Sequence, residues 1–521
     1  MPGWLDRLLS RAAPAPAPPP PEPREERPAE RLARLLETAA FTDDGQAFDA
    51  AAEIRARLVS LPVAALAALD EPVRGALWYH APGRDWLAAT AAVRERFAPP
   101  LAVWVLGLLA SHPNGYVREP AVQALAETGE PAALSFLLLR AADWVGPVRL
   151  RAEDGVRARL DEAHIGSFVA TLPLVARLRE SERAGASSLR GAIDELLTAA
   201  PAAPVLLDAL GSSDAATRRE AFRLLRAGGH VDARELAARG LRAGDVVVEA
   251  EAARLAIALD DDTFRGLLSE ILSKGPARTR AEALVSAHRR WGAGAEEWLL
   301  WKLFDGSRNV RAVAQRALDG PQPGRAVAEY RRATQWTDLA VALTALGEMR
   351  VRKQADWVAS FLSHPQARVR AAAAIATARL RGDASPPALL PLVGDAHPRV
   401  SGAATRALLP RARLVDTAVL ERMYAADVHP HVRHNALRLL GRAGPWSGLR
   451  WLLVGAGDRD RRIAEMAMRE LRAWRQRANR TVATPAADEM RGLHDALAAH
   501  GAALGDELRG WLAWLLGVAG R

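Results

Sequence analysis

Apolar residues recur at helical spacing along most of the chain. An apolar residue, an alanine four positions later and a leucine four positions after that share one face of an α-helix, as Val310, Ala314 and Leu318 would. A second apolar segment, here EEWLLWKLF, ends shortly before the first of these residues. The pattern predicts pairs of antiparallel helices, in which the small alanine lets a neighbouring helix approach closely.

The pattern has a fixed period. We call the first apolar position of each second helix its anchor, and seven of the eleven steps between successive anchors are 31 residues. The anchors are Val117, Val148, Ser188, Thr217, Val248, Thr279, Val310, Asp338, Val369, Val400, Val432 and Ile463. Two helices in one such period cannot bury both apolar faces, so the copies must stack. The sequence therefore predicts an all-α fold without a sheet, an α-solenoid of about twelve 31-residue helical hairpins.

Shifts in composition divide the chain into five parts. They are a short amphipathic segment (1–11), a Pro-rich linker (12–29), an irregular helical cap (30–99), the repeats (100–474) and a C-terminal helical cap or tail (475–521). A solenoid exposes an apolar face at each end and needs atypical repeats to cover it. We therefore expect the apolar side chains of the last helix to pack inward, namely Trp511, Leu512, Leu515 and Leu516.

The turn before each second helix carries a recurrent motif. It reads D-x-x-x-x-V-R-x-x-A-x-x-x-L, often with Pro just before the Val, and extends over roughly Pro100–Trp474. This motif resembles the short HEAT-like repeats of the phycobilisome-lyase type. The resemblance implies a HEAT-like solenoid. That family includes scaffolds, lyase subunits, a metal-dependent hydroxylase and a DNA glycosylase branch, so the resemblance does not select one activity.

Two polar positions of the motif have a structural interpretation. The position five residues before the anchor is usually Asp, and His112 and His364 occupy it in two repeats. We interpret these histidines as turn residues that accept backbone N–H groups, because the hydroxylase relatives use His-Glu pairs and this chain has none. The arginine after the anchor, such as Arg118, should pair with the turn Asp of a neighbouring repeat.

The sequence lacks the residues or motifs that several kinds of chemistry require. The absence of Cys excludes disulfides, Cys-ligated metals and thiol catalysis. Dinucleotide, P-loop, zincin, serine-hydrolase and EF-hand motifs are missing too, so we predict no catalytic residue, no metal site and no cofactor, while enzyme activity stays open. The longest apolar runs are about half a membrane span, which predicts a cytoplasmic chain without a transmembrane segment. Residues 2–11 or 507–521 are candidates for peripheral membrane contact.

The basic residues are almost all arginine. Only three of the 70 Lys and Arg residues are Lys, and the net charge is +9. An arginine six positions after the anchor points about 200° from the buried face, toward solvent on the side that usually lines the concave surface of a solenoid. We interpret these arginines as a ridge that binds an acidic partner, with a solvated arginine-rich surface as the alternative. They are Arg223, Arg254, Arg316, Arg406, Arg438 and Arg469.

These observations favour a non-enzymatic protein-interaction scaffold that binds a protein or peptide on its concave face. One alternative is a nucleic-acid-binding protein of the HEAT-like DNA glycosylase type. Such relatives need an acidic residue flanked by tryptophans, and the nearest match is Asp143-Trp144, which also reads as a turn. Another alternative is a lyase or chaperone-like subunit for a cofactor-bearing protein.

Overall fold

The computed structural model describes residues 26–79, 84–179, 186–426, 429–478 and 484–518. The predicted segment 1–11 and most of the linker 12–29 lie outside these residues, and the first helix begins at Pro28. Within the described residues the regular structure is helical and no strand occurs, as the sequence predicts. The chain forms two compact units, which divide between Pro276 and Ala277.

Unit 1 consists of four leading helices followed by helical pairs. Its helices are α1 (Pro28–Phe41), α2 (Asp44–Val59), α3 (Val63–Tyr79), α4 (Trp86–Arg96), α5 (Pro99–Leu109), α6 (Gly115–Glu127), α7 (Ala133–Arg140), α8 (Gly146–Arg157), α9 (Ile165–Ala170), α10 (Leu172–Arg179), α11 (Ala186–Thr198), α12 (Ala203–Ala209), α13 (Ala215–Gly228), α14 (Ala233–Gly240), α15 (Val246–Ala258) and α16 (Asp261–Lys274). The leading helices pack on the first repeat, since α2 contacts α5 and α4 contacts both α5 and α6.

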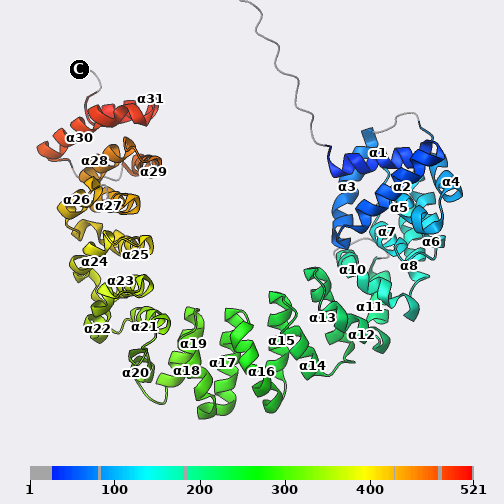
Figure 1. The fold of residues 1–521 in the computed structure, drawn as a ribbon, viewed down its shortest axis with the longest axis horizontal. Helices are drawn as coiled ribbons and strands as arrows, with labels where there is room; N and C mark the ends of the chain where they lie inside the picture. The colour runs from blue at the N-terminus through cyan, green and yellow to red at the C-terminus, as the bar shows by residue number, and fades with distance from the viewer. Residues whose placement is uncertain (1–25, 80–83, 180–185, 427–428, 479–483, 519–521) are drawn as a thin grey trace, which may run out of the picture. The chain divides into compact units, whose positions relative to one another are not determined.

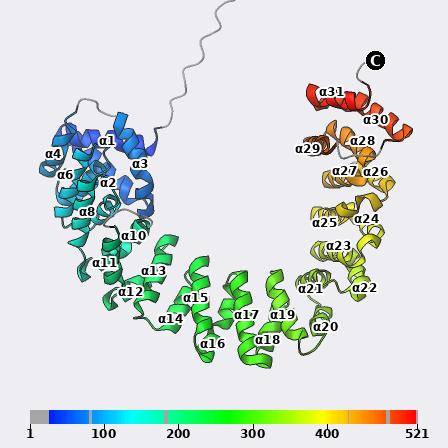
Figure 2. The same ribbon diagram turned by 180° about the vertical axis from the view of Figure 1, so that it is seen from behind.

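Unit 2 continues the pairs to the C-terminal helices. Its helices are α17 (Ala277–Trp291), α18 (Glu296–Lys302), α19 (Arg308–Asp319), α20 (Arg325–Arg331), α21 (Trp336–Glu348), α22 (Ala355–Ala359), α23 (Ala367–Arg381), α24 (Pro386–Val393), α25 (Pro398–Leu408), α26 (Thr417–Ala425), α27 (Pro430–Ala443), α28 (Pro445–Ala456), α29 (Arg461–Arg477), α30 (Ala487–His500) and α31 (Asp506–Leu515). In Figures 1 and 2 the second helices form one layer, namely α19, α21, α23, α25, α27 and α29. The first helices form the other layer, namely α18, α20, α22, α24, α26 and α28.

The predicted apolar face of the second helices is the core of each stack. Eleven of the twelve alanines that lie four positions after an anchor are fully buried, the exception being Ala192. Second helices of successive repeats pack directly on one another, as α21 does on α23 and α23 on α25. The alanine makes this possible, because a larger side chain there would separate the two helices.

One repeat departs from the predicted register. Ser188 is exposed, and the buried residues of α11 are Leu189, Ile193 and Leu197, one position later than predicted. The step before this repeat is 40 residues rather than 31. The extra residues accommodate α10, which follows α9 directly and contacts α3, α7 and α11.

The arginine after the anchor forms the predicted ladder in four repeats. In each, its guanidinium binds the turn Asp that lies 25 residues further along: Arg118 to Asp143 at 2.9 Å, Arg280 to Asp305 at 2.7 Å, Arg370 to Asp395 at 2.9 Å and Arg433 to Asp458 at 2.7 Å. Arg311 pairs with Glu348 instead, because Ala333 occupies the turn position of the next repeat. Both members of the Arg118–Asp143 pair are fully buried, so the ladder is part of the core.

The two turn histidines take the structural role predicted for them. The Nδ1 atom of His112 accepts the Asn114 N–H at 3.1 Å, and that of His364 accepts the Gln366 N–H at 3.1 Å. The turn Asp of other repeats accepts the same N–H two residues later. Burial lowers the pKa of His112 to about 4, and nearby Arg118 lowers it further. A neutral imidazole therefore replaces the carboxylate as an acceptor.

The C-terminal helices cover the last repeat. α30 packs on α28, and Leu512 and Leu516 belong to the apolar core of unit 2. Trp511 and Leu515 are half-buried against that core, whereas Trp514 is 69% exposed. The side chains that were expected to pack inward therefore do so.

Candidate functional site

The six arginines of the predicted ridge fall into two groups. In unit 1, Arg223 forms ion pairs with Glu220 at 2.9 Å and with Asp194 of the preceding repeat at 3.1 Å. Arg254 is exposed and also has a partner. These two arginines therefore do not offer free guanidinium groups.

The other four ridge arginines lie on second helices of unit 2. They are Arg316 on α19, Arg406 on α25, Arg438 on α27 and Arg469 on α29. Arg438 is half-buried and the other three are exposed. Within the part of the chain that the structure describes, no carboxylate forms an ion pair with any of the four.

A local sequence difference explains this contrast. Three positions after the anchor, the repeats of Arg223 and Arg254 carry Glu220 and Glu251, whereas the repeat of Arg406 carries Ala403. Residues three apart on a helix are neighbours, and Glu220 binds Arg223 in this way. The remaining repeats with a ridge arginine carry Val313, Asn435 and Met466 at this position, and none of these can neutralise a guanidinium.

The second-helix layer of unit 2 contains a groove lined by arginine. Its first part is a hollow of about 840 Å³ that crosses α19, α21, α23 and α25. Its floor consists of small residues two and three positions after the anchors, namely Ala340, Ala371, Ala372, Gly402 and Ala403. Its rim carries the exposed Arg308, Arg368, Arg399 and Arg406, and the buried Arg311 also lines it. The one acidic lining residue is Glu348, which Arg311 binds at 2.5 Å.

The second part adjoins the first, with which it shares Ile375 and Arg406. It is a hollow of about 620 Å³ near the C-terminal ends of α21, α23 and α25. Five arginines line it and no acidic residue does: Arg350, Arg352, Arg379, Arg406 and Arg411. We call the two hollows together the arginine groove.

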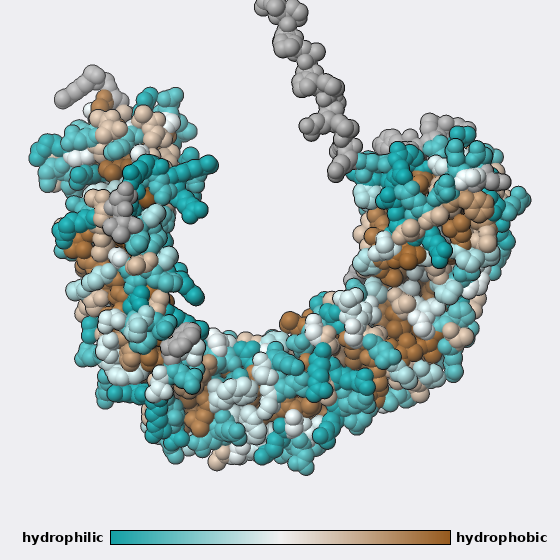
Figure 3. Space-filling view, in the orientation of Figure 1, coloured by the Kyte–Doolittle hydropathy of each residue, from teal (hydrophilic) through white to brown (hydrophobic). Residues whose placement is uncertain are grey.

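Positive charge continues beyond the groove to α27 and α29. The pKa of His434 on α27 is lowered, chiefly by burial; the guanidiniums of Arg438 and Arg469 lower it further, while Asn435 and the Asp460 carboxylate oppose them. These two ridge arginines therefore act on the same region of the surface. In Figure 3 this part of unit 2, from α23 to α29, presents many hydrophilic side chains.

Four exposed arginines of the groove lie outside the set predicted from the sequence. Arg308 and Arg399 lie in the first turn of α19 and α25, and Arg350 and Arg352 follow α21. All four lie outside the position used to define the ridge. The rim could have been predicted from the arginines that directly precede an anchor, at 368 and 399.

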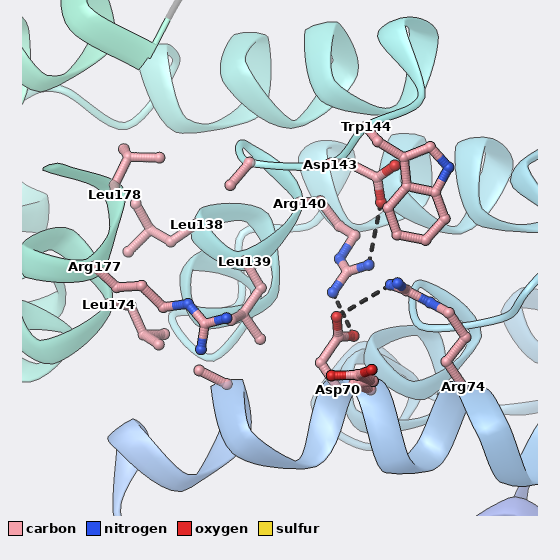
Figure 4. A pocket seen from close by; sticks show the side chains of 13 residues that line it. Asp70, Arg74, Leu138, Leu139, Arg140, Asp143, Trp144, Leu174, Arg177 and Leu178 are labelled. Carbon is pink, nitrogen blue, oxygen red and sulfur yellow. Dashed lines mark hydrogen bonds and ion pairs between the residues drawn. The ribbon is translucent and has the colours of Figure 1, made fainter. Parts of the chain in front are cut away.

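The pair Asp143-Trp144 does not form a free acidic site. The Asp143 carboxylate accepts hydrogen bonds from Arg118, from Arg140 at 3.1 Å and from the Val145 N–H at 2.9 Å, and the residue is 3% exposed. Figure 4 shows Asp70 beside Arg74 and Arg140, and the exposed Trp144 close to them. A carboxylate whose oxygens are occupied by two buried guanidiniums and a backbone N–H is not available to attack or deprotonate a substrate.

No cluster of three or more His, Asp or Glu side chains in the described part of the chain could hold a metal ion. No helix there is long and apolar enough to span a bilayer.

Comparison with known proteins gives one family match and a set of distant structures. The family of HEAT repeats matches residues 326–409, which extend from α20 to the end of α25 and include most of the arginine groove. A search of the curated proteins found no match.

Solved structures with a similar fold include importin beta. It is 12% identical, with a TM-score of 0.39, over 93% of this chain and 74% of its own. Yeast importin-beta is 12% identical, with a TM-score of 0.46, over 94% of this chain and 73% of its own. Within the described residues the repeated pairs, the arginine ladder and the family match agree, and the chain is a HEAT-like repeat protein with an all-α solenoid fold.

Proposed function

We propose that the chain is a non-enzymatic scaffold that binds an acidic protein segment in the arginine groove, on the concave face of the solenoid. The observation that carries this proposal is the set of groove and ridge arginines without a carboxylate partner among the described residues, above all Arg316, Arg406 and Arg438. Exposed arginines that are already paired leave little net field. Unpaired ones attract carboxylates and can bind them through two parallel hydrogen bonds.

The floor of the groove supports an extended peptide as the occupant. Alanine and glycine at 371, 372, 402 and 403 present little side-chain bulk, so a peptide backbone can approach α23 and α25 closely. The arginines of the rim then stand on either side of it. We assign this binding to the cytoplasm, in line with the expectation from the sequence.

Nucleic acid is the alternative occupant, because a phosphate backbone is also an anion. Because Arg118 and Arg140 already bind the Asp143 carboxylate, Asp143 does not support a glycosylase reaction at that residue. Simple nucleic-acid binding stays open to test. The lyase or chaperone-like alternative has no residue in the groove that favours it.

Fluorescence anisotropy with a labelled 15-residue peptide, in which glutamate alternates with glycine and alanine, tests the proposal. The variant Arg406→Gln/Arg438→Gln should bind this peptide about tenfold or more weakly than the parent. The matched control Arg223→Gln/Arg254→Gln removes the same charge from the same register of unit 1 and should change affinity less than about twofold.

Three outcomes contradict the proposal. Equal losses in the two variants would mean that net charge, rather than the groove, attracts the peptide. Absence of binding by the parent at about 50 mM salt would remove the function altogether. Tighter binding of a duplex or single-stranded oligonucleotide, with the same dependence on Arg406 and Arg438, would assign the groove to nucleic acid.

A further inference from the structure

The second part of the arginine groove, around Arg350, concentrates positive charge in a small space. Five guanidiniums line a hollow of about 620 Å³, whose remaining lining includes Ile375, Ala378 and Pro410. Two of the five have carboxylate neighbours outside the lining: Arg411 binds Asp383 at 3.0 Å, and Arg379 lies 3.9 Å from Glu348. In the described residues, Arg350, Arg352 and Arg406 form no ion pair.

The helix ends near this hollow offset only part of the charge. A helix C-terminus carries about half a negative elementary charge, and three helices end here, α21, α23 and α25. Glu348 is already bound by Arg311, so Asp383 and the three helix ends offset about two and a half of the five positive charges. About two and a half remain, which exceeds the charge of one carboxylate and is enough to balance a phosphate monoester at neutral pH.

Arg350 has a backbone conformation that favours glycine. Its φ is +55°, and it is the one non-glycine residue with positive φ among the described residues. It ends α21 in a Schellman motif, in which the Val351 N–H donates to the Leu346 carbonyl at 3.2 Å and the Arg350 N–H donates to the Gly347 carbonyl at 3.3 Å. Glycine would meet the needs of this turn with less strain. The arginine therefore has a use in its side chain, and that side chain lines the hollow.

We propose that this hollow binds a phosphate monoester, carried on a phosphorylated serine or threonine of the acidic protein segment. The proposal rests on the proposed function, since the hollow shares Arg406 and Ile375 with the rest of the groove. Guanidiniums from three successive repeats can surround the tetrahedral oxygens of a phosphate, which a planar carboxylate cannot match. A nucleic-acid phosphodiester carries a single charge and would balance less of the positive charge that this hollow concentrates.

The test uses three versions of the 15-residue peptide that differ at the central residue, which is phosphoserine, glutamate or serine. Anisotropy should show that the full-length parent binds the phosphoserine peptide about tenfold or more tightly than the glutamate peptide. Arg350→Gly should reduce this preference below about threefold, because it weakens binding of the phosphoserine peptide much more than binding of the glutamate peptide, and it should not lower the melting temperature. Arg352→Gln should have the same effect on the preference without altering the turn.

The control variant Arg308→Gln removes a rim arginine of the first hollow. It should weaken all three peptides to a similar extent and keep the preference for phosphoserine. A loss of preference in this variant would show that the phosphate is not bound around Arg350.

The remaining outcomes separate this inference from the proposed function. Equal binding of the phosphoserine and glutamate peptides by the parent would overturn the phosphate site and leave the acidic-segment scaffold standing. Failure of the parent to bind any of the three would overturn both. A 5′-phosphorylated oligonucleotide that binds more tightly than the phosphoserine peptide, and loses this advantage in Arg350→Gly, would reassign the phosphate to nucleic acid.

Discussion

The two units use the same repeat to make different surfaces. In both, the arginine after the anchor is tied to a turn Asp, as Arg118 is in unit 1 and Arg370 in unit 2. They differ three and six positions after the anchor, where unit 1 pairs Glu220 with Arg223 and unit 2 places Ala403 before Arg406. In the repeat of Arg223 a glutamate at this position binds the arginine to its own helix, whereas Arg406 has no such neighbour.

The largest expected effect concerns the arginine ladder, and it differs between the units. Arg118→Leu leaves the Asp143 carboxylate buried without its bidentate partner and should cost about 3–5 kcal/mol of unfolding free energy in unit 1. Arg370→Leu should cost less, about 1–3 kcal/mol, because its pair is 18% and 12% exposed. Amide hydrogen exchange in α6 for the first variant and in α23 for the second measures both. Equal costs would show that burial does not set the strength of the ladder.

The next expected effect is a loss of stability of unit 1 at acidic pH. The pKa of His112 falls to about 4 on folding, chiefly through burial, from an ordinary value of 6.5. Its contribution to stability is therefore complete above pH 6.5 and is lost as the pH falls toward 4, to a total of about 3 kcal/mol. His112→Asn keeps a hydrogen-bond acceptor but does not titrate. Hydrogen exchange in α5 and α6 at pH 7.5 and 4.5 should show a smaller loss of stability in this variant than in the parent.

A smaller effect distinguishes a structural from a functional arginine in unit 2. Arg350→Gly should raise the unfolding free energy by about 0.5–1 kcal/mol, since glycine tolerates the positive φ better. Chemical denaturation followed through hydrogen exchange in α21 measures the change. A clear loss of stability would show that Arg350 is retained for the fold and would weaken its assignment to the phosphate site.

The smallest expected effect comes from a variant that gives unit 1 an unpaired arginine, like those of unit 2. Asp194→Asn/Glu220→Gln frees the guanidinium of Arg223 from both ion pairs. With the groove disabled by Arg406→Gln/Arg438→Gln, this change should raise affinity for the glutamate peptide by about two- to threefold. The matched control Asp208→Asn/Glu162→Gln removes the same charge elsewhere in unit 1, at two carboxylates that form no ion pair among the described residues. The same gain in the control would mean that net charge, rather than the freed arginine, is responsible.

Much of the fold could be predicted because it depends on local spacing. The period, the buried alanines and the ladder follow from side chains that face one another at fixed intervals along a helix or between successive repeats. The register failed at Ser188, where a longer step accommodates α10 and the buried face moves to Leu189. The composition of that segment contains no indication of how the added residues would pack.

The candidate site was predictable only in part. The exposure of Arg316, Arg406 and Arg469 follows from their angle on the helix, and the Glu three positions after the anchor was a readable indication of pairing in unit 1. The contact between Arg223 and Asp194 of the preceding repeat was not readable, because it depends on how two helices are aligned.

The sequence by itself determined the repeat, the burial of its alanines and the pairing of its turn residues, since each depends on spacing within one or two repeats. Only the tertiary structure decided the division between Pro276 and Ala277, and which arginines share a hollow. Arg350, Arg379 and Arg406 come from three successive repeats and lie at different positions in each. They meet because stacking brings three helix ends together, and no periodic pattern along the chain records that arrangement.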